Sequence, residues 1–252
     1  MVNHLDPNEF GLRGRRILVV GAAQGIGQAT AVWLAKLGAD VIATDIKPCE
    51  DTSRLAGGIT THTLDLSNTD EVVRCVENAD SDENPLYGVV NCAGLLLRRP
   101  LEDTTEDEIA IQTAVNQSGG FFLARAAMAT FIRRGGGRLV LYTSQGAFTG
   151  GFNGSIPYAM NKAAITALVK SLARHGALHG VTVNAVAPGA ADTAMLRGGM
   201  TDEDLDNFRK MIPMQRFADP SELAGPTAFL LSDWARYVTG TTLHVNGGQL
   251  MV

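Results

Sequence analysis

Cysteine is scarce in this 252-residue chain, and its three cysteines follow no pattern typical of a disulfide framework or a metal site. Cys49, Cys75 and Cys92 are odd in number, widely spaced and form no Cys-x-x-Cys pair. The N-terminus lacks an extended apolar stretch behind a basic start, and no segment reaches the roughly 18 apolar residues that a membrane-spanning helix needs. We therefore expect reduced thiols in a soluble, cytoplasmic protein without a membrane partner.

Charge is also sparse, because Asp, Glu, Lys and Arg make up 19% of the residues and the net charge is −5. Basic runs are limited to Arg15-Arg16, Arg98-Arg99 and Arg133-Arg134, which argues against nucleic acid as a partner. His175 and His179 are four residues apart, but no His-Glu-x-x-His pattern or nearby carboxylate completes a zinc site, so no metal is expected. The absence of Gly-x-Ser-x-Gly counts against a serine hydrolase.

Strand-like apolar runs alternate with helical patterns along the chain, and 45% of the residues are hydrophobic, enough for one large core. The expected strands lie near residues 15–20, 40–44, 59–64, 86–90, 138–143, 181–187 and 242–246. The expected helices lie at 25–37, 68–79, 102–134 in two pieces, 157–178 and 220–231, the last with Asp219 as its cap and Pro220 at its first position. This alternation is typical of an α/β fold with a doubly wound parallel sheet of about seven strands and helices on both faces.

No change in composition divides the chain, so we expect one domain over residues 15–252, preceded by an N-terminal lead at 1–14. Inside that domain, the Gly198-Gly199 pair precedes a short amphipathic pattern at 201–211 and has the character of a hinge. We therefore expect residues 190–215 to form a lid over a substrate site.

A glycine turn follows the first apolar run. It reads Gly21-Ala22-Ala23-Gln24-Gly25-Ile26-Gly27, between the expected strand and the helical pattern that begins at 25. Gly21 allows a tight turn, Gly25 lets backbone N–H groups approach a pyrophosphate, and Gly27 lets helix and strand pack closely. The order of strand, glycine turn and helix predicts a dinucleotide site, although the spacing is Gly-x-x-x-Gly-x-Gly rather than Gly-x-Gly-x-x-Gly.

Tyr158 and Lys162 are four residues apart within one expected helix, so both side chains project from the same face. A phenol titrates near pH 10 and exchanges protons poorly at neutral pH unless a neighbouring cation stabilises its phenolate. Bringing its pKa to about 7 requires roughly 4 kcal/mol, which one desolvated ammonium can supply. The pair therefore predicts a general acid and base.

Polar and glycine positions follow most of the expected strands. Gly21, Asp45, Asp65, Asn91, Ser144 and Pro188 all fall at or just past a strand end. Because such a sheet binds its ligand beyond the carboxyl ends of its strands, one pocket can hold them all. Asp45 is placed to accept hydrogen bonds from the adenosine ribose and to repel a 2′-phosphate, which predicts NAD(H), although Lys47 nearby could favour NADP(H).

These marks, in this order, resemble the short-chain dehydrogenase/reductase family in its compact single-domain branch. The resemblance spans the whole chain and rests on Gly21 to Gly27, Asp65, Asn91-Cys92-Ala93-Gly94, Asn116, Ser144, Tyr158 with Lys162, and Pro188-Gly189 leading to Thr193. Three positions depart from the usual family pattern: Val20, Cys92 and Asn246 in Asn246-Gly247-Gly248. The resemblance implies a Rossmann-type fold and an oxidoreductase activity. It also implies a homo-oligomer, with a tetramer preferred over a dimer, in which the helix after Tyr158 and the C-terminal strand lie at the subunit interfaces.

The resemblance also implies roles for individual residues. Asn116, Ser144, Tyr158 and Lys162 would be catalytic, with Ser144 holding the substrate oxygen and Asn116 positioning a water that links Lys162 to solvent. Thr143 and Ser155 are rival hydroxyls to Ser144. The expected cofactor-binding residues are Gly21, Gln24, Gly25, Ile26, Gly27, Asp45, Ile46, Asp65, Leu66, Asn91, Ala93, Gly94, Tyr158, Lys162, Pro188, Gly189 and Thr193.

Apolar residues near these motifs predict the substrate class. Leu95, Phe148, Phe152, Met195 and Met200 are expected to line an apolar pocket, so the expected reaction is NAD(H)-dependent hydride transfer to or from a moderately apolar secondary alcohol or ketone. An NADP(H)-dependent ketone or 3-oxoacyl thioester reductase is the alternative. A non-catalytic dinucleotide-binding regulator is a further one, although such proteins need not keep a proton donor.

Overall fold

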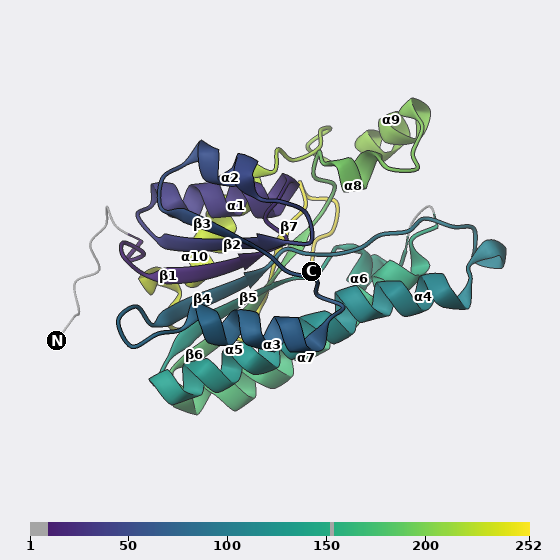
Figure 1. Cartoon of the computed structure of the whole chain (residues 1–252). Helices are drawn as coiled ribbons and strands as arrows, with labels where there is room; N and C mark the ends of the chain where they lie inside the picture. The colour runs from purple at the N-terminus through teal and green to yellow at the C-terminus, as the bar shows by residue number, and fades with distance from the viewer. Residues whose placement is uncertain (1–9, 152–153) are drawn as a thin grey trace.

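A computed structural model describes residues 10–151 and 154–252, which build a seven-stranded sheet whose neighbouring strands are all parallel. The strands are β1 (Arg16–Val20), β2 (Asp40–Asp45), β3 (Ile59–Thr63), β4 (Leu86–Asn91), β5 (Gly137–Tyr142), β6 (Val181–Pro188) and β7 (Thr242–Val245). Their order is β3-β2-β1-β4-β5-β6-β7, so the chain runs outward from the centre to one edge and then fills the other half (Figure 1). This order confirms the predicted doubly wound fold and puts the change of direction between β1 and β4.

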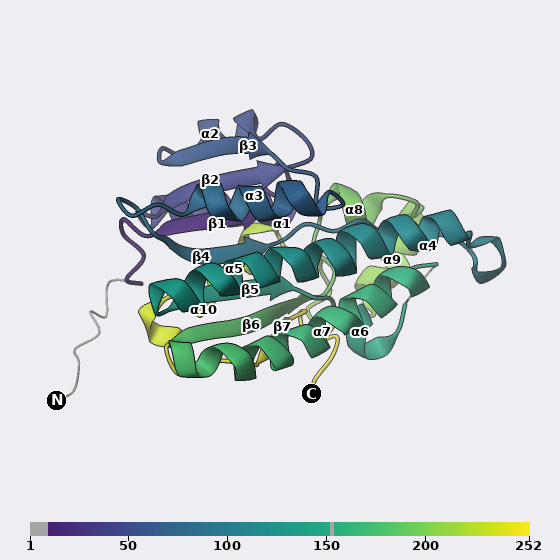
Figure 2. The ribbon, with the colours of Figure 1, turned by 60° about the horizontal axis from the view of Figure 1, so that its bottom comes forward.

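Helices cover both faces of the sheet, as Figures 1 and 2 show. One face carries α1 (Gly25–Lys36), α2 (Glu50–Leu55) and α10 (Ser221–Leu231), and the other carries α3 (Thr69–Ala79), α5 (Gly120–Arg134) and α7 (Ile156–Gly176). Shorter helices are α4 (Glu106–Thr113), α6 (Gly146–Thr149), α8 (Ala194–Arg197) and α9 (Asp202–Lys210), with 3-10 turns at Leu101–Asp103, Ala177–His179 and Asp233–Ala235. Within the described ranges, no helix combines the length and apolar character needed to cross a bilayer.

Successive residues of β1 point into two separate cores, because side chains alternate between the faces of a strand. Leu18 and Val20 join the core under α3, α5 and α7, whereas Ile17 and Val19 join the core under α1 and α10. All four are at most 1% exposed, so burial of each side chain contributes roughly 1.5–3 kcal/mol. Burial on both faces explains why the strand reads as an unbroken apolar run.

The strands lie within one residue of their predicted bounds. The expected helix pair at 102–134 is instead one continuous run, in which a π-helical segment, η2 (Ala114–Gly119), joins α4 to α5. Helix α10 begins at Ser221, one residue later than predicted, so Pro220 and not Asp219 is its N-cap. The Asp219 carboxylate, one position further out, still accepts a hydrogen bond from the Ser221 N–H at 2.8 Å. Residues 1–9 of the expected lead lie outside the described ranges, and Leu12, 1% exposed, packs in the core with α1.

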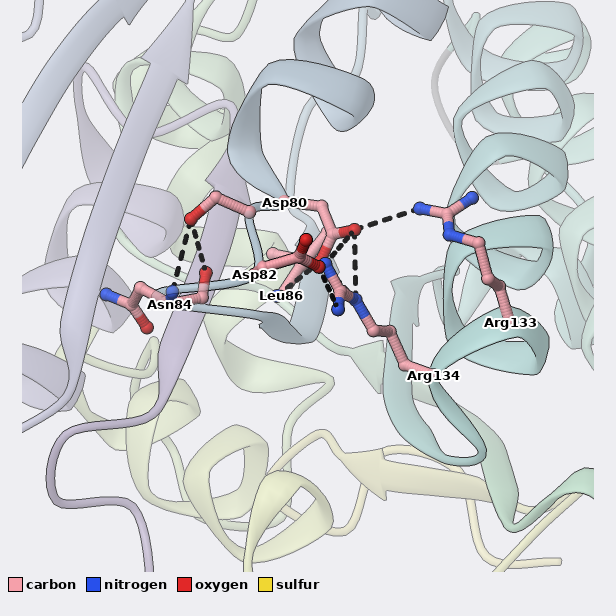
Figure 3. A network of polar contacts seen from close by, with 7 residues as sticks. Asp80, Asp82, Asn84, Leu86, Arg133 and Arg134 are labelled. Atoms are coloured by element: carbon pink, nitrogen blue, oxygen red, sulfur yellow. Dashed lines mark hydrogen bonds and ion pairs between the residues drawn. The ribbon is translucent and has the colours of Figure 1, made fainter.

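An ion-pair network ties the loop before β4 to the end of α5 (Figure 3). The Asp80 carboxylate accepts hydrogen bonds from Arg134, from the Leu86 N–H at 2.9 Å and from Arg133 at 2.9 Å. Burial alone would raise the pKa of Asp80, but these hydrogen bonds, that from Arg134 foremost, hold its pKa below the ordinary value. The network thus fixes the amino-terminal edge of the sheet, at the opposite end of the strands from the motif residues.

Candidate active site

A cavity of about 1500 Å³ opens at the carboxyl-terminal edge of the sheet. Its wall includes residues that follow the strands from β1 to β6, as expected where parallel strands end together. The predicted site residues on this wall are Gly21, Gln24, Gly25, Ile26, Gly27, Asp45, Ile46, Asp65, Leu66, Ala93, Gly94, Leu95, Ser144, Tyr158, Lys162, Pro188, Gly189, Thr193, Met195 and Met200. Small-molecule pockets usually enclose roughly 300–1,000 Å³, so this one is large enough for a dinucleotide together with a substrate.

Three predicted residues within the described ranges are not on the wall. Asn91 and Asn116 are only 6% and 2% exposed and lie behind it. Phe148 was expected in the substrate pocket, but it is absent from the cavity wall, and its ring packs edge-on against His244 with 4.7 Å between ring centres. Phe152 lies outside the described residues.

The glycine turn forms a cradle whose backbone packs too closely for side chains at Gly21 and Gly27. A Cβ at Gly27 would lie 1.9 Å from the Gly21 carbonyl oxygen, and one at Gly21 would lie 2.4 Å from the Ala93 backbone nitrogen. Gly21 also has φ +84°, in the left-handed region that favours glycine. Helix α1 begins here without a side-chain cap and without an acidic residue in its first turn. Its free N–H groups therefore suit the pyrophosphate of a dinucleotide.

Asp45 ends β2 and faces the cavity beside this turn. Its carboxylate accepts hydrogen bonds from the Ala23 N–H at 3.1 Å and the Lys47 N–H at 3.0 Å. These two bonds hold the carboxylate in one orientation, and each of its oxygens can still accept another hydrogen bond. The adenosine ribose hydroxyls are donors of the required kind.

Tyr158 and Lys162 project from the first turns of α7 into the same cavity. The Lys162 ammonium lies 5.6 Å from the centre of the Tyr158 ring. It donates a hydrogen bond to the Tyr142 carbonyl at 2.9 Å and is 3% exposed. The carbonyl at the end of β5 thus fixes the position of the ammonium beside the phenol.

Burial dominates the titration of both groups. It raises the pKa of Tyr158 to about 12 and lowers the pKa of Lys162 to about 8, because each charged form loses hydration. The cation whose charge lowers the pKa of Tyr158 is Arg98. This differs from the expectation that Lys162 alone would bring the phenol toward neutrality, since desolvation outweighs the nearby positive charge.

Ser144 follows β5 and lines the cavity, as do Thr143 and Ser155. Its Oγ accepts a hydrogen bond from the Gly146 N–H at 3.1 Å, which leaves its own hydrogen for a ligand. Thr143 is 2% exposed and donates to the Lys162 carbonyl at 2.7 Å, so its hydroxyl serves the packing of α7. Ser155 lines the cavity at the start of α7.

Asn116 sits in the π-helical segment and clamps the loop after β4. Its Oδ1 accepts from the Leu95 N–H and its Nδ2 donates to the Leu95 carbonyl, both at 2.8 Å. A Cβ at Gly94 would lie 3.1 Å from the Asn116 Oδ1 and 3.4 Å from the Lys162 Nζ, so glycine lets these two polar groups approach the loop. Behind it, the Asn91 Oδ1 accepts from the Ala93 N–H at 3.1 Å and shapes the same loop.

Residues after β6 close the other side of the cavity. Thr193 caps α8, since its Oγ1 accepts from the Leu196 N–H at 3.3 Å, and it also lines the cavity. A Cβ at Gly189 would lie 2.8 Å from the Asn246 Cα, so glycine is required there for close packing against the turn after β7. The segment from 190 to 215 has its own small core of Ala190, Leu196, Leu205 and Ile212, against which Met200, Phe208 and Phe217 pack.

Arg98 and Gln145 are cavity residues that the sequence analysis did not identify. Arg98 entered there only as half of an Arg-Arg pair too short to bind nucleic acid. Its position four residues after the Asn-Cys-Ala-Gly turn was the available signal. Over the part of the chain that the structure describes, no group of three or more His, Cys, Asp or Glu side chains could hold a metal ion.

Known proteins share this arrangement. Residues 21–249 match the family model described as Enoyl-(Acyl carrier protein) reductase. The chain is 36% identical over 245 residues to the 3-oxoacyl-[acyl-carrier-protein] reductase of Salmonella typhimurium, covering 95% of this chain and 98% of the relative. It is 32% identical over 251 residues to the 5-keto-D-gluconate 5-reductase of Escherichia coli, covering 96% and 98%.

A solved structure is also similar to this chain over nearly its full length. It is a Beutenbergia cavernae protein described as an NAD(P) dependent gluconate 5-dehydrogenase, with NADP bound at low occupancy. Its TM-score is 0.89 at 33% sequence identity, and the match covers 96% of this chain and 99% of that one. Fold, cavity and similarity over nearly the full length agree. The chain therefore belongs to the short-chain dehydrogenase/reductase family and is an oxidoreductase that binds a nicotinamide cofactor.

Proposed function

We propose that this protein transfers a hydride between NAD(H) and a secondary alcohol or its ketone, with Tyr158 as the general acid and base. The observation that best supports this proposal is that Tyr158, Lys162 and Ser144 line the same cavity as the glycine cradle. A bound nicotinamide supplies or accepts the hydride, which no side chain can do. The accompanying proton must be handled at the substrate oxygen by this chain.

Each polar group then has a distinct task. Ser144 donates its hydroxyl hydrogen to the substrate oxygen and holds it against the phenol of Tyr158, stabilising charge as it develops. Lys162 contributes positive charge near the phenol and is proposed to hold the nicotinamide ribose. Asn116 keeps the loop after β4 in place through Leu95 and, within the wide π-helical turn, is proposed to support a water on the path from Lys162 to solvent.

The raised pKa of Tyr158 bears on the direction of reaction. With a pKa of about 12, the phenol is protonated at neutral pH, which is the form that gives a proton to a ketone oxygen during reduction. Alcohol oxidation requires the phenolate, which the positive charge of Arg98 favours against the effect of burial.

Cofactor choice depends on Asp45. Its fixed carboxylate repels a 2′-phosphate and can accept from both ribose hydroxyls, which supports NAD(H). The similar structure with NADP and the wall residue Lys47 favour the alternative, an NADP(H)-dependent ketone or 3-oxoacyl thioester reductase. That alternative uses the same catalytic residues, so the two differ in cofactor and substrate only.

The Asp45→Ala variant is expected to shift the ratio of kcat/KM for NADP(H) over NAD(H) upward by roughly tenfold or more, because a repulsive charge and a ribose acceptor are lost. Steady-state kinetics with both cofactors measures the ratio. Asp51→Ala, an exposed carboxylate on α2 outside the cavity, is the matched control and should leave the ratio unchanged. An unchanged ratio in Asp45→Ala would rule out this basis for NAD(H) preference.

A screen of secondary alcohols, ketones and 3-oxoacyl thioesters with NAD(H) and NADP(H), followed through the absorbance of the reduced nicotinamide, tests the reaction itself. Turnover of an alcohol or ketone with NAD(H) is the expected result. Faster turnover of a thioester with NADPH would support the alternative. Dinucleotide binding without turnover of any substrate would support a non-catalytic regulator, which the presence of Tyr158, Lys162, Ser144 and Asn116 together argues against.

The lid, the oligomeric state and the cellular location are three further expectations that belong to this proposal. We infer that residues 190–215 act as a lid, supported by their separate small core, their contribution to the cavity wall and Gly199 with φ +73° before α9. We infer a homotetramer in the cytoplasm, supported by the family resemblance and by exposed apolar side chains such as Ile109, Phe121 and Met160 on α4, α5 and α7.

A further inference from the structure

Arg98 brings a positive charge into the cavity, near Tyr158. It lies in the loop after β4 and lines the same wall as Tyr158 and Ser144. It is close enough to Tyr158 for its charge to affect the titration of the phenol. Nothing in the proposed hydride transfer requires a guanidinium at this position, so Arg98 calls for a separate explanation.

Two backbone carbonyls hold the guanidinium in one orientation. Its Nε donates to the Gly198 carbonyl at 3.0 Å and its Nη2 donates to the Leu196 carbonyl at 3.2 Å. Both acceptors belong to the end of α8, about a hundred residues along the chain. A guanidinium has five N–H groups, and the remaining ones of Arg98 have no partner among residues 10–151 and 154–252. They are available to a ligand in the cavity.

No carboxylate neutralises Arg98 within the described part of the chain. The charged residues on the cavity wall are Asp45, Lys47, Asp65, Arg98, Lys162, Asp192 and Asp219. Asp192 is paired with Arg197 at 2.7 Å, and Asp219 accepts from Ser221 at the start of α10. Asp45 and Asp65 follow β2 and β3, across β1 from the strand that leads to Ser144.

The next residue, Arg99, shows the opposite arrangement. Its guanidinium pairs with Glu108 at 2.6 Å, is more than half exposed and is absent from the cavity wall. Burial lowers the pKa of Arg98, which means that its charge is poorly solvated, whereas Glu108 raises the pKa of Arg99. A partly buried cation without a counter-charge favours an anionic ligand, and a planar guanidinium fork suits a carboxylate.

We propose that Arg98 binds a carboxylate of the substrate, so that the enzyme acts on a hydroxy acid and its keto acid. This inference rests on the proposed function and narrows its substrate class. The carbinol of the hydroxy acid would lose its hydride to a bound NAD⁺ and its proton to the phenolate form of Tyr158, giving the keto acid and a neutral phenol, while the carboxylate stays unchanged on Arg98. A 3-oxoacyl thioester has a neutral carbonyl group in place of that carboxylate and would leave Arg98 unpaired.

The test compares hydroxy acids with neutral alcohols of the same skeleton: D-gluconate with D-glucitol, and 3-hydroxybutyrate with 1,3-butanediol. Kinetics with NAD⁺ gives the ratio of kcat/KM for acid over alcohol in the native enzyme, in Arg98→Gln, in Arg98→Lys and in Arg99→Gln. We expect at least one acid to be preferred roughly 10- to 100-fold, as a charge-assisted hydrogen bond predicts. Arg98→Gln should abolish that preference, Arg98→Lys should keep part of it, and Arg99→Gln should not change it.

Two results would overturn the role of Arg98. One is preference of the native enzyme, with NAD⁺, for the neutral alcohols or for the N-acetylcysteamine thioester of 3-hydroxybutyrate. The other is an equal loss of kcat/KM for acid and alcohol in Arg98→Gln, which would show that Arg98 only ties α8 to the loop after β4.

Calorimetric titration of the same two acids into the protein with NAD⁺ separates this inference from the proposed function. If no substrate is turned over but an acid binds and Arg98→Gln abolishes its binding, the proposed function fails and the carboxylate site stands. If some alcohol is turned over but neither acid binds or reacts, the proposed function stands and the carboxylate site fails. Absence of both turnover and acid binding rejects both.

Discussion

At the residue scale, the site depends on two ionisable side chains in positions that do not favour their charge. Tyr158 and Lys162 are buried, and the loss of hydration raises the pKa of the phenol and lowers that of the ammonium. A stable core would place apolar side chains here. Ionisable groups kept in such a position at a cavity are typical of a functional site.

The cost of burying Lys162 predicts a specific pH dependence of stability. Its pKa is about 8 in the folded protein against an ordinary value of 10.5, so between these pH values the unfolded chain binds more protons than the folded one. The free energy of unfolding contributed by Lys162 therefore rises with pH across this window, by up to about 3 kcal/mol. Urea denaturation from pH 7 to 10.5 should show that rise in the native protein relative to Lys162→Met.

Lys170→Met is the matched control, because Lys170 is exposed on the same helix. Its pH profile of stability should run parallel to that of the native protein. Parallel profiles for the native protein and Lys162→Met would contradict the account, since they would mean that burial does not disfavour the charged form of Lys162.

At the element scale, the strands were predictable because each has its own signal. The residues of β1 are buried on both faces, so they form an apolar run bounded by turns, and the same holds for β4 and β5. Helices α2, α6 and α8 have four to six residues, too few to show a helical period. The π-helical segment at Ala114–Gly119 has no period of its own in the sequence, and its one mark is Asn116, which the family resemblance places at a kink and whose side chain holds Leu95.

The Asp80 network in Figure 3 is expected to stabilise the junction between the loop before β4 and the end of α5. Asp80→Asn is expected to lower the free energy of unfolding by about 2 kcal/mol at pH 7, because Arg133 and Arg134 lose their shared, nearly buried carboxylate. The pKa of Asp80 is lowered in the folded protein, so its contribution is present at neutral pH and is lost as pH falls below the ordinary value of 3.8. Denaturation at pH 7 and pH 3 should therefore show a smaller difference at the lower pH.

Asp82→Asn serves as the control, since the Asp82 side chain is 97% exposed and pairs only with Arg134. Exposed pairs contribute little, so this variant should match the native protein. Equal destabilisation by the two substitutions would show that the burial of Asp80 does not matter.

At the scale of the whole molecule, the site follows from topology. Parallel strands end at one edge of the sheet, so residues far apart in the sequence, such as Gly21, Ser144 and Pro188, meet in one cavity. Their convergence could be predicted because each follows a recognisable strand. The role of Arg98 could not, because its hydrogen-bond partners lie 98 and 100 residues away in a segment whose path over the cavity no local pattern specifies.

The central claim is that the phenol of Tyr158 exchanges the proton that accompanies hydride transfer at a bound nicotinamide. The most direct measurement compares turnover and NAD⁺ binding in Tyr158→Phe, with Tyr237→Phe, an exposed tyrosine, as the control. The account predicts that Tyr158→Phe binds NAD⁺ within about twofold of the native protein but loses at least about a hundredfold in kcat, the usual contribution of a general acid or base. Turnover by Tyr158→Phe at the native rate would contradict it.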